Sequence, residues 1–347
     1  MEQIALLISE LKKKGHENLL ACPPGSKQIE RLAPLKIDIT QIPMRQDYDL
    51  IAALKIRGLV RSAKPDIVHT HHAIAHAVTL LALTALARPP LVVSRRVSFS
   101  PRKNPFSRWK YCSSRIDAYS VVSRSVKETL VRAGVRPEKI HVIYSALDPK
   151  RFENLPSRSD IRKSLQIQEG VPVVGKLANY SVWKGHHVFL ETAKISLEKR
   201  KDILFLMIGK DTEKLAGEIQ RLGLSGSVRI LGFRKDAPQI LSILDVSVNA
   251  AIEGEGLSGA MRESLALGVP VIASDVSGNR EIVRANETGW IVPPNDPRSL
   301  SQKILQVLEN PGPSREMAQK GRKWVLENAM ADKMSDGFIS LYGSLIK

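Results

Sequence analysis

The sequence predicts an α/β protein made of two doubly wound, Rossmann-like domains with parallel sheets. Short apolar runs rich in β-formers alternate with amphipathic stretches along the whole chain. These runs form two successive series, and 347 residues are too many for one ordinary core. Apolar strands that alternate with helices are typical of parallel sheets covered on both faces.

The predicted strands are short and regularly spaced. The first series lies at residues 19–22, 66–71, 90–94, 118–123 and 140–145. The second series lies at residues 171–177, 203–209, 228–233, 246–250, 269–275 and 289–293. Amphipathic segments such as 125–134 and 187–200 separate the runs and are predicted helices.

The domain boundary is expected in the polar, proline-containing segment DPKRFENLPSRSD at 148–160. Residues 1–150 are then the first domain and residues 151–330 the second. A last helix at 331–347 is expected to pack back toward the first domain.

The chain opens on a predicted helix, where a doubly wound domain normally opens on a strand. Segment 2–16 ends in Lys12, Lys13, Lys14 and Gly15, and basic residues followed by glycine are typical of a helix C-terminus. The first strand of this domain and the loop after it are therefore expected to be missing. Loss of a central strand would leave two neighbouring strand edges unpaired.

Composition narrows the class of protein. With 43% hydrophobic and 25% charged residues, the chain is neither fibrous nor disordered. No apolar run reaches the ~20 residues of a spanning helix, and the lysines after the first apolar run are in the wrong order for a signal peptide. Cys22 and Cys112 have no CxxC spacing, so we expect a reduced, cytoplasmic protein with no zinc site.

The net charge of +17 is concentrated in the first half. Residues 1–150 carry 25 basic and 12 acidic side chains (+13), and residues 151–347 carry 27 and 23 (+4). Segment 88–115 has eight basic residues, no acidic ones and several aromatic ones. Such a segment indicates a surface for anionic lipid, nucleic acid or a phosphorylated substrate, or simply a solvated basic face.

The most informative segment is AIEGEGLSGAMRESLALGVPVIASDVSGNREIV at 251–283. Glu255 and Glu263 are eight positions apart, which on one helix would separate them by about 80°. The intervening GLSG instead places Glu255 in a loop, with a helix that begins near Ser258 and ends at Gly268. Backbone N–H groups at such a helix N-terminus bind phosphate. The loop after the next strand, SDVSGNREIV, should lie at the same sheet edge.

This segment resembles the E-x7-E donor motif of family 4 glycosyltransferases, retaining enzymes of the GT-B fold. Further segments match that family in order: HTHHAIAH, VVSRSV to ALDPKRF, VGKLANYSVWKGHHVFLETA, LGFRKDAPQILSILDVSVNAA and TGWIVPPND. The resemblance covers essentially the whole chain. It implies two domains that face a cleft.

The resemblance implies a role for each matching residue. Glu255 would contact the transferred sugar, Glu263 the ribose hydroxyls, and Lys184 the pyrophosphate. The resemblance places a second basic residue of the donor site after the strand glycine, often arginine in the family. Here Lys176 follows Gly175, and the segment up to Lys184 is longer than in the family. The backbone near the sugar and diphosphate would be that of Gly256, Leu257 and Ser258. Two ammonium groups stabilise a departing diphosphate, so no metal or other cofactor is expected.

Four histidines lie in DIVHTHHAIAH. Strand alternation puts His69 and His71 on one face, and His71 matches the family histidine that approaches the donor sugar from the first domain. His72 and His76 fit surface positions in a following loop and helix. No Asp, Glu or Cys accompanies them after Asp66, which argues against a metal site.

We therefore expect a retaining glycosyltransferase that moves a sugar from a nucleoside diphosphate to an acceptor held by the first domain. The acceptor is expected to be an anionic or membrane glycolipid such as lipopolysaccharide core, with the protein peripheral on the inner face of the cytoplasmic membrane. Two alternatives stay open. One is a form impaired by the missing strand and glycine-rich loop, and the other is a non-catalytic basic binding protein.

Overall fold

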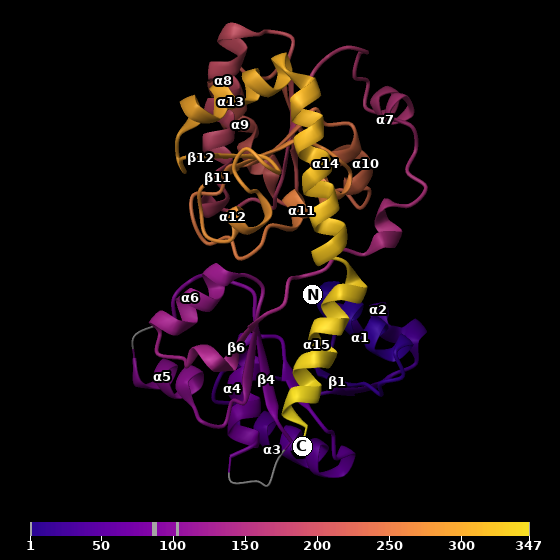
Figure 1. Cartoon of the computed structure of the whole chain (residues 1–347), viewed down its shortest axis with the longest axis vertical. Helices are drawn as coiled ribbons and strands as arrows, with labels where there is room; N and C mark the ends of the chain where they lie inside the picture. Colours follow the sequence, from indigo (N-terminus) through magenta and orange to yellow (C-terminus); the bar gives the residue numbers. More distant parts are fainter. Residues whose placement is uncertain (1, 85–88, 102–103, 347) are drawn as a thin grey trace. The chain divides into compact units, whose positions relative to one another are not determined.

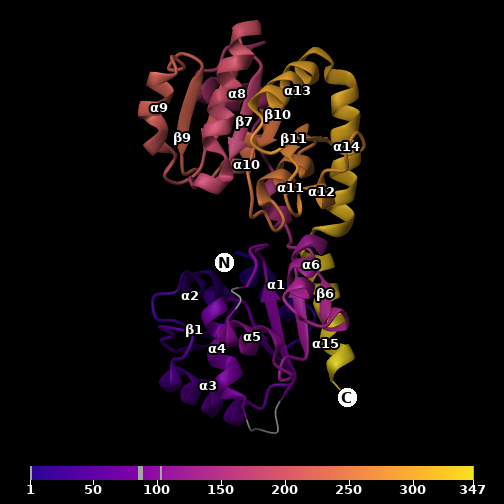
Figure 2. The same ribbon diagram turned by 90° about the vertical axis from the view of Figure 1, so that its left-hand side faces the viewer.

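A computed structural model describes residues 2–84, 89–101 and 104–346. The chain forms two compact units (Figures 1 and 2). Unit 1 comprises Met1–Ala146 and Met330–Lys347, and unit 2 comprises Leu147–Ala329. All ladders are parallel, and the fold is the predicted pair of Rossmann-like α/β domains.

Unit 2 is built on one six-stranded sheet in the order β12-β11-β10-β7-β8-β9. Its strands are β7 (Val173–Leu177), β8 (Leu204–Ile208), β9 (Val228–Gly232), β10 (Val246–Asn249), β11 (Val271–Ser274) and β12 (Trp290–Val292). Each lies within an apolar run that predicted a strand. The strand order reverses between β7 and β10, because β8 and β9 extend the sheet one way and β11 and β12 the other.

Helices cover both faces of this sheet. On β8, Phe205 and Met207 pack into one core cluster, while Leu204, Leu206 and Ile208 pack into another on the opposite face. The first cluster includes residues of α8 (His186–Lys199), α9 (Ala216–Arg221) and α13 (Pro297–Glu309). The second includes residues of α7 (Arg158–Ser164) and α10 (Ala237–Ser242). Burial on both faces explains why these strands read as continuous apolar runs.

The remaining segments of unit 2 connect and border this core. They are the 3₁₀ turns η3 (Pro149–Phe152), η4 (Val182–Lys184) and η5 (Thr212–Leu215), and the helices α11 (Gly259–Ala266), α12 (Asn279–Ile282) and α14 (Pro311–Asn328). Helix α14 packs on α11.

Unit 1 contains two separate sheets, β1-β2 and β3-β4-β5-β6. The strands are β1 (Leu19–Cys22), β2 (Asp38–Gln41), β3 (Val68–Thr70), β4 (Leu91–Arg95), β5 (Ala118–Val121) and β6 (Ile140–Val142). Strand β2 was not predicted, because its DITQ sequence has no apolar run. Within the described residues, β1 and β3 each pair with one strand, so the two sheets of unit 1 are not joined by a strand ladder.

The helices of unit 1 are α1 (Glu2–Lys13), α2 (Lys27–Leu32), α3 (Leu50–Ala63), α4 (Ala73–Ala82), α5 (Pro105–Cys112), α6 (Arg124–Arg132) and α15 (Ala331–Leu345), with 3₁₀ turns η1 (Ala33–Leu35) and η2 (Pro137–Lys139). Of the helices, α1, α6 and α15 correspond to segments predicted as helices. The first helix ends before Gly15, which has a φ of +83°.

The last helix belongs to unit 1. Helix α15 packs on α1 through Leu7, Leu11, Met334 and Phe338 (Figure 1). Its Leu341 packs against Val92 of β4 and Ala118 of β5, so it also covers the four-stranded sheet.

Candidate active site

A cavity of about 390 Å³ opens at the carboxyl ends of β7 and β10. Its lining includes Lys176 and Leu177 from β7, Asn249 from β10, and Glu255 and Ser258 from the loop before α11. These two strands are the ones between which the strand order reverses. Ligands of open α/β sheets bind outside the carboxyl ends of the strands at such a switch point.

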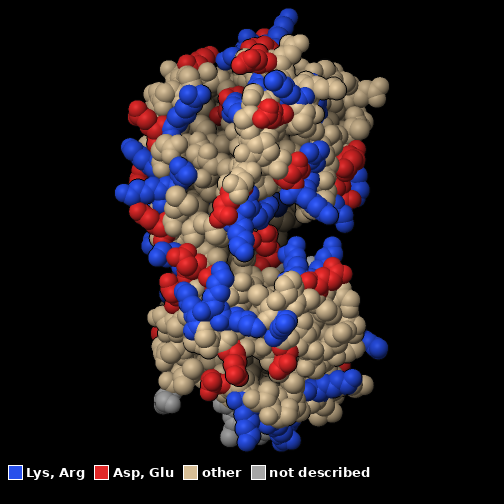
Figure 3. All heavy atoms as spheres, turned by 90° about the vertical axis from the view of Figure 1, so that its right-hand side faces the viewer, with Lys and Arg blue, Asp and Glu red and all other residues tan. Residues whose placement is uncertain are grey.

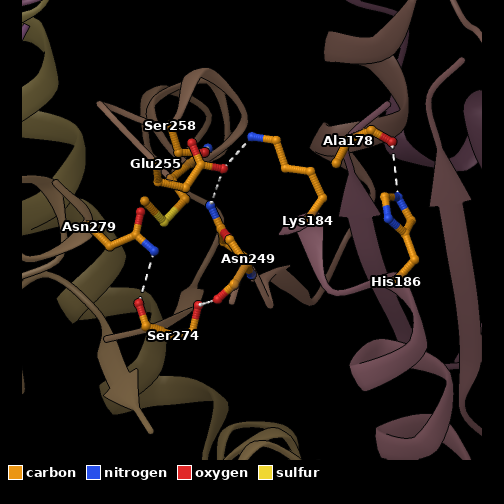
Figure 4. A network of polar contacts seen from close by, with 10 residues as sticks. Ala178, Lys184, His186, Asn249, Glu255, Ser258, Ser274 and Asn279 are labelled. Carbon is orange, nitrogen blue, oxygen red and sulfur yellow. Dashed lines mark hydrogen bonds and ion pairs between the residues drawn. The ribbon is translucent and has the colours of Figure 1, made fainter. Parts of the chain in front are cut away.

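Lys184 and Glu255 point toward each other across this cavity wall (Figure 4). The Lys184 ammonium donates to Glu255 Oε1, and the Asn249 amide nitrogen lies 3.5 Å from the same oxygen. The Glu255 side chain is only 6% exposed, whereas that of Lys184 is 22% exposed. Lys184 Nζ also lies 4.1 Å from the centre of the Trp183 ring, a cation–π distance.

A glycine lets the Lys184 loop reach the end of β10. Gly185 has a φ of +63°, and a Cβ there would lie 1.9 Å from the carbonyl oxygen of Ala250. The backbone N–H of Ile252 donates to the carbonyl of Trp183 over 2.8 Å. The turn that carries Lys184 is thereby fixed against the segment that leads to Glu255.

Lys176 lies in the same cavity wall and is 2% exposed. Burial lowers the pKa of its ammonium to about 7, with a further lowering by Lys184 and an opposing effect of Glu255. The long segment between Lys176 and Lys184 does not move the Lys176 side chain out of the cavity wall. Ala178 and Tyr180 donate backbone hydrogen bonds to Ile208 and Lys210 at the end of β8, so this segment continues beside β8 before η4. Gly175 is not among the residues that line the cavity, and a Cβ there would meet the Leu244 side chain at 2.5 Å.

The predicted loop and helix around the two glutamates are confirmed. Glu255 lies in a loop, and the Ser258 hydroxyl caps α11 by accepting from the Met261 N–H. The following loop is held to the first, because Gly278 N–H donates to the Glu255 carbonyl over 3.1 Å. Ser274 Oγ likewise donates to the Ala251 carbonyl (Figure 4). Gly256 is buried and Leu257 is partly buried in the loop between Glu255 and Ser258.

Glu263 is not among the residues that line the cavity. It lies on α11, where its Oε1 accepts from Arg151 Nη1 over 2.9 Å. The sequence did not single out Arg151 or Asn249. Asn249 could have been found from its place at the end of a predicted strand, whereas Arg151 was assigned to the linker.

In unit 1, His71 follows directly after β3 and belongs to a cluster of polar side chains formed with His69, Ser94, Arg96 and Tyr342. As predicted, His69 and His71 share a face, with ring centroids 3.9 Å apart. His69 Nδ1 lies 2.6 Å from the Tyr342 hydroxyl, and His69 Nε2 lies 2.8 Å from Ser94 Oγ. Arg96 Nη2 donates to His71 Nδ1 over 3.3 Å, which leaves the proton on Nε2. Burial, with the neighbouring Arg96, lowers the pKa of His69 to about 3. Burial, with His69 and Arg96 beside it, lowers the pKa of His71 well below its ordinary value.

His72 and His76 differ from each other. His72 is exposed and precedes α4. The expected surface position of His76 is wrong, because it is 2% exposed and lies edge-on to the rings of Tyr111 and Tyr119. Helix α4 turns it inward with its apolar neighbours. Among the described residues, no group of His, Cys, Asp and Glu side chains has a geometry that could hold a metal ion.

The basic segment is only partly a solvated face. Arg88, Arg102 and Lys103 lie outside the described residues. The others mostly bind protein groups: Lys110 is buried and pairs with Asp47 over 2.8 Å, Arg95 donates to Tyr111, and Arg115 donates to the Leu83 carbonyl. On the face drawn in Figure 3, Lys and Arg side chains are interspersed with Asp and Glu on both units.

Comparison with known proteins identifies the family. Residues 157–324 match the family model described as "Glycosyl transferases group 1", and residues 3–151 match "Glycosyltransferase Family 4". The UDP-Gal:alpha-D-GlcNAc-diphosphoundecaprenol alpha-1,3-galactosyltransferase of Escherichia coli is 26% identical, over 76% of this chain and 71% of that protein.

Two solved structures share the fold across nearly the whole chain. A glycosyltransferase from Rickettsia africae has a TM-score of 0.89 and 24% identity, with 99% of this chain and 94% of that chain covered. Anabaena HepE in complex with UDP has a TM-score of 0.85 and 21% identity, with 99% and 96% covered. The fold is therefore GT-B, and the chain belongs to the group 1 glycosyltransferases with a family 4 first unit.

Proposed function

We propose that this glycosyltransferase binds a nucleoside diphosphate sugar in the unit 2 cavity and transfers the sugar with retention of configuration to a lipid-linked acceptor. The enzyme depends on a nucleotide sugar. The observation that carries the donor assignment is the convergence of Lys176, Lys184 and Glu255 at the switch point of the sheet. The UDP bound in HepE supports the same ligand class.

The charges of the cavity suit the departing diphosphate. When the bond between the sugar and the diphosphate breaks, negative charge grows on the phosphate oxygen. Two ammonium groups fixed in a cavity wall stabilise that charge with little reorganisation. A diphosphate also competes with Glu255 for Lys184, so that the Glu255 carboxylate can accept hydrogen bonds from sugar hydroxyls. We propose that no metal ion takes part.

The residues assigned from the family resemblance keep those roles as proposals. Glu255 contacts the sugar and Glu263 the ribose hydroxyls. The backbone of 256–258 lies near the diphosphate, and His71 donates from Nε2 to the sugar. A neutral His71 that donates from Nε2 follows from the Arg96 hydrogen bond.

For the acceptor, we propose a glycolipid at the inner face of the cytoplasmic membrane, either a lipid diphosphate or lipopolysaccharide core. The name of the Escherichia coli relative specifies a diphosphoundecaprenol acceptor. Phe99, Phe106 and Trp109 of the basic segment are 36–44% exposed, and Arg108 is exposed beside them. Aromatic and basic side chains together favour the interface of an anionic bilayer. No described helix is both long enough and apolar enough to span a membrane.

A transfer assay tests the reaction. Radiolabelled UDP-sugars are supplied with lipid-linked or lipopolysaccharide acceptors, and the anomeric configuration of the product is read by proton NMR. A product with the donor's configuration supports the proposal, and an inverted product contradicts it. Flotation with anionic liposomes at low salt tests the membrane contact: loss of binding in a Phe106→Ser/Trp109→Ser variant but not in Leu326→Ser is expected, and no flotation of the wild type would reject it.

A further inference from the structure

Arg151 and Glu263 form an ion pair between two segments of unit 2 that are 112 positions apart in sequence. Arg151 Nη1 lies 2.9 Å from Glu263 Oε1, and the two side chains are 28% and 12% exposed. Arg151 lies in η3, in the first turn after the start of unit 2, and Glu263 lies in α11. Helix α11 is thus connected to the segment that begins the unit.

The backbone that carries Arg151 is itself held in place. The Asp148 side chain accepts from the Lys150 N–H over 3.1 Å and so caps η3. The Leu147 N–H donates to the Ala329 carbonyl over 2.8 Å at the other end of the unit. With its base fixed, the guanidinium of Arg151 approaches Glu263 from a defined direction.

The chemistry of this pair suits recognition of a ribose diol. A glutamate has three side-chain torsions, and its carboxylate must take one orientation to accept from two adjacent hydroxyls at once. An arginine is always charged and presents donors in a rigid plane, so it keeps the carboxylate ionised and limits its rotation. A carboxylate has about four lone-pair positions, so Glu263 can accept from Arg151 and from ribose hydroxyls together.

We propose that Arg151 is a positioning residue for ribose recognition: it holds the Glu263 carboxylate in the orientation that accepts hydrogen bonds from the ribose hydroxyls of the donor. This inference rests on the proposed function, in which Glu263 meets the ribose. It gives the segment at the start of unit 2 a part in donor selection.

The test separates ribose recognition from a purely structural ion pair. Isothermal titration calorimetry measures two affinities, that of a nucleoside diphosphate and that of its 2′,3′-dideoxy form. The nucleoside diphosphate is UDP, or the one whose base the wild type binds. The wild type should prefer the ribose form by about tenfold or more. The preference is the affinity of the ribose form divided by that of the dideoxy form. In Arg151→Ala and Arg151→Gln this ratio should fall about fivefold or more, while the affinity of the dideoxy form stays within about twofold of its wild-type value.

The Glu263→Gln variant and the double variant complete the cycle. If Arg151 acts through Glu263, combining Arg151→Gln with Glu263→Gln should lower the preference no further than Glu263→Gln alone. Arg158→Ala is the matched control, because Arg158 pairs with Asp245 over 2.7 Å in the same unit, and neither residue belongs to α11 or lines the cavity. It should leave both affinities unchanged.

Two failures are distinguishable. If both Arg151 variants weaken the ribose and dideoxy forms equally, or weaken neither, then Arg151 does not position Glu263 and the inference is wrong while the proposed function stands. If the wild type binds no nucleoside diphosphate, the proposed function itself is wrong.

Discussion

The Lys184 ammonium and the Glu255 carboxylate form an ion pair in the wall of the unit 2 cavity. Glu255 is nearly buried, and its carboxylate contacts this ammonium and the Asn249 amide. The pair holds two groups that the proposed reaction uses separately, the ammonium for the diphosphate and the carboxylate for the sugar.

Lys184→Ala should lower turnover about 100-fold or more, because it removes one of two positive charges that stabilise the departing diphosphate. It should also lower the free energy of unfolding by about 1–3 kcal/mol, since Glu255 loses its counter-charge in a nearly buried position. Steady-state kinetics and urea unfolding measure the two effects. Lys214→Ala is the control, because Lys214 pairs with Asp211 on the exposed surface of the same unit and should change neither quantity measurably. Full activity of the Lys184→Ala enzyme would rule out this role.

Lys176 should make diphosphate binding depend on pH. Its pKa is lowered to about 7, whereas a bound diphosphate favours the ammonium form. Affinity for UDP should therefore fall by up to about tenfold per unit as the pH rises above 7. In Lys176→Arg the guanidinium stays charged, so this fall should disappear. Titration calorimetry from pH 6 to 9 checks this, and identical pH profiles of the two proteins would contradict it.

The lowered pKa of Lys176 should also make the free energy of unfolding depend on pH. Unfolding returns Lys176 to its ordinary pKa of 10.5, so the unfolded chain binds more protons between about pH 7 and pH 10.5. The free energy of unfolding should therefore rise with pH across that window in the wild type. In Lys176→Met the rise should be smaller, as measured by urea unfolding at pH 7, 8 and 9. An equal rise in both proteins would argue against a lowered pKa at Lys176.

Gly185→Ala should disrupt the turn that carries Lys184. A Cβ at this position would collide with the Ala250 carbonyl, and the backbone is left-handed there. We expect a loss of about 2 kcal/mol or more in the free energy of unfolding and weaker binding of UDP. Gly217→Ala is the matched control, because a Cβ there meets nothing within 4 Å and Gly217 lies inside α9. That change should be neutral or slightly stabilising. Equal effects of the two changes would contradict the steric argument.

His71 should stay neutral with its proton on Nε2 between pH 5 and pH 8. Its pKa is well below the ordinary value, and Arg96 donates to its Nδ1. Nitrogen-15 NMR of labelled histidine reads the tautomer directly. In Arg96→Ala the Nε2–H preference should be lost, whereas Arg108→Ala, an exposed arginine of the same basic segment, should leave it unchanged. A wild-type His71 that titrates near pH 6.5 would refute this prediction.

The sequence predicted most strands of this fold because their apolar runs are buried on both faces, as Leu204–Ile208 shows. Strand β2 escaped because its DITQ residues are partly or fully exposed, so no apolar pattern marks it. His76 was misplaced because an isolated histidine carries no signal of burial, and only packing against Tyr111 and Tyr119 reveals it.

The cavity was predictable only in part. The spacing of Glu255 and Glu263 and the glycines between them located the loop and the helix start. The side chains that touch these glutamates come from distant segments: Lys184 is 71 positions from Glu255, and Arg151 is 112 positions from Glu263. Such pairs depend on how strands are ordered in the sheet, which local patterns do not specify.

The central claim is that unit 2 binds a nucleoside diphosphate through its two lysines. Titration calorimetry of UDP, GDP, ADP and CDP with the wild-type protein and with Lys184→Ala tests it most directly. The account predicts one site per chain for one of these bases, with affinity reduced about tenfold or more in the variant. If none of the four binds the wild type, or if the variant binds as tightly as the wild type, the claim is contradicted.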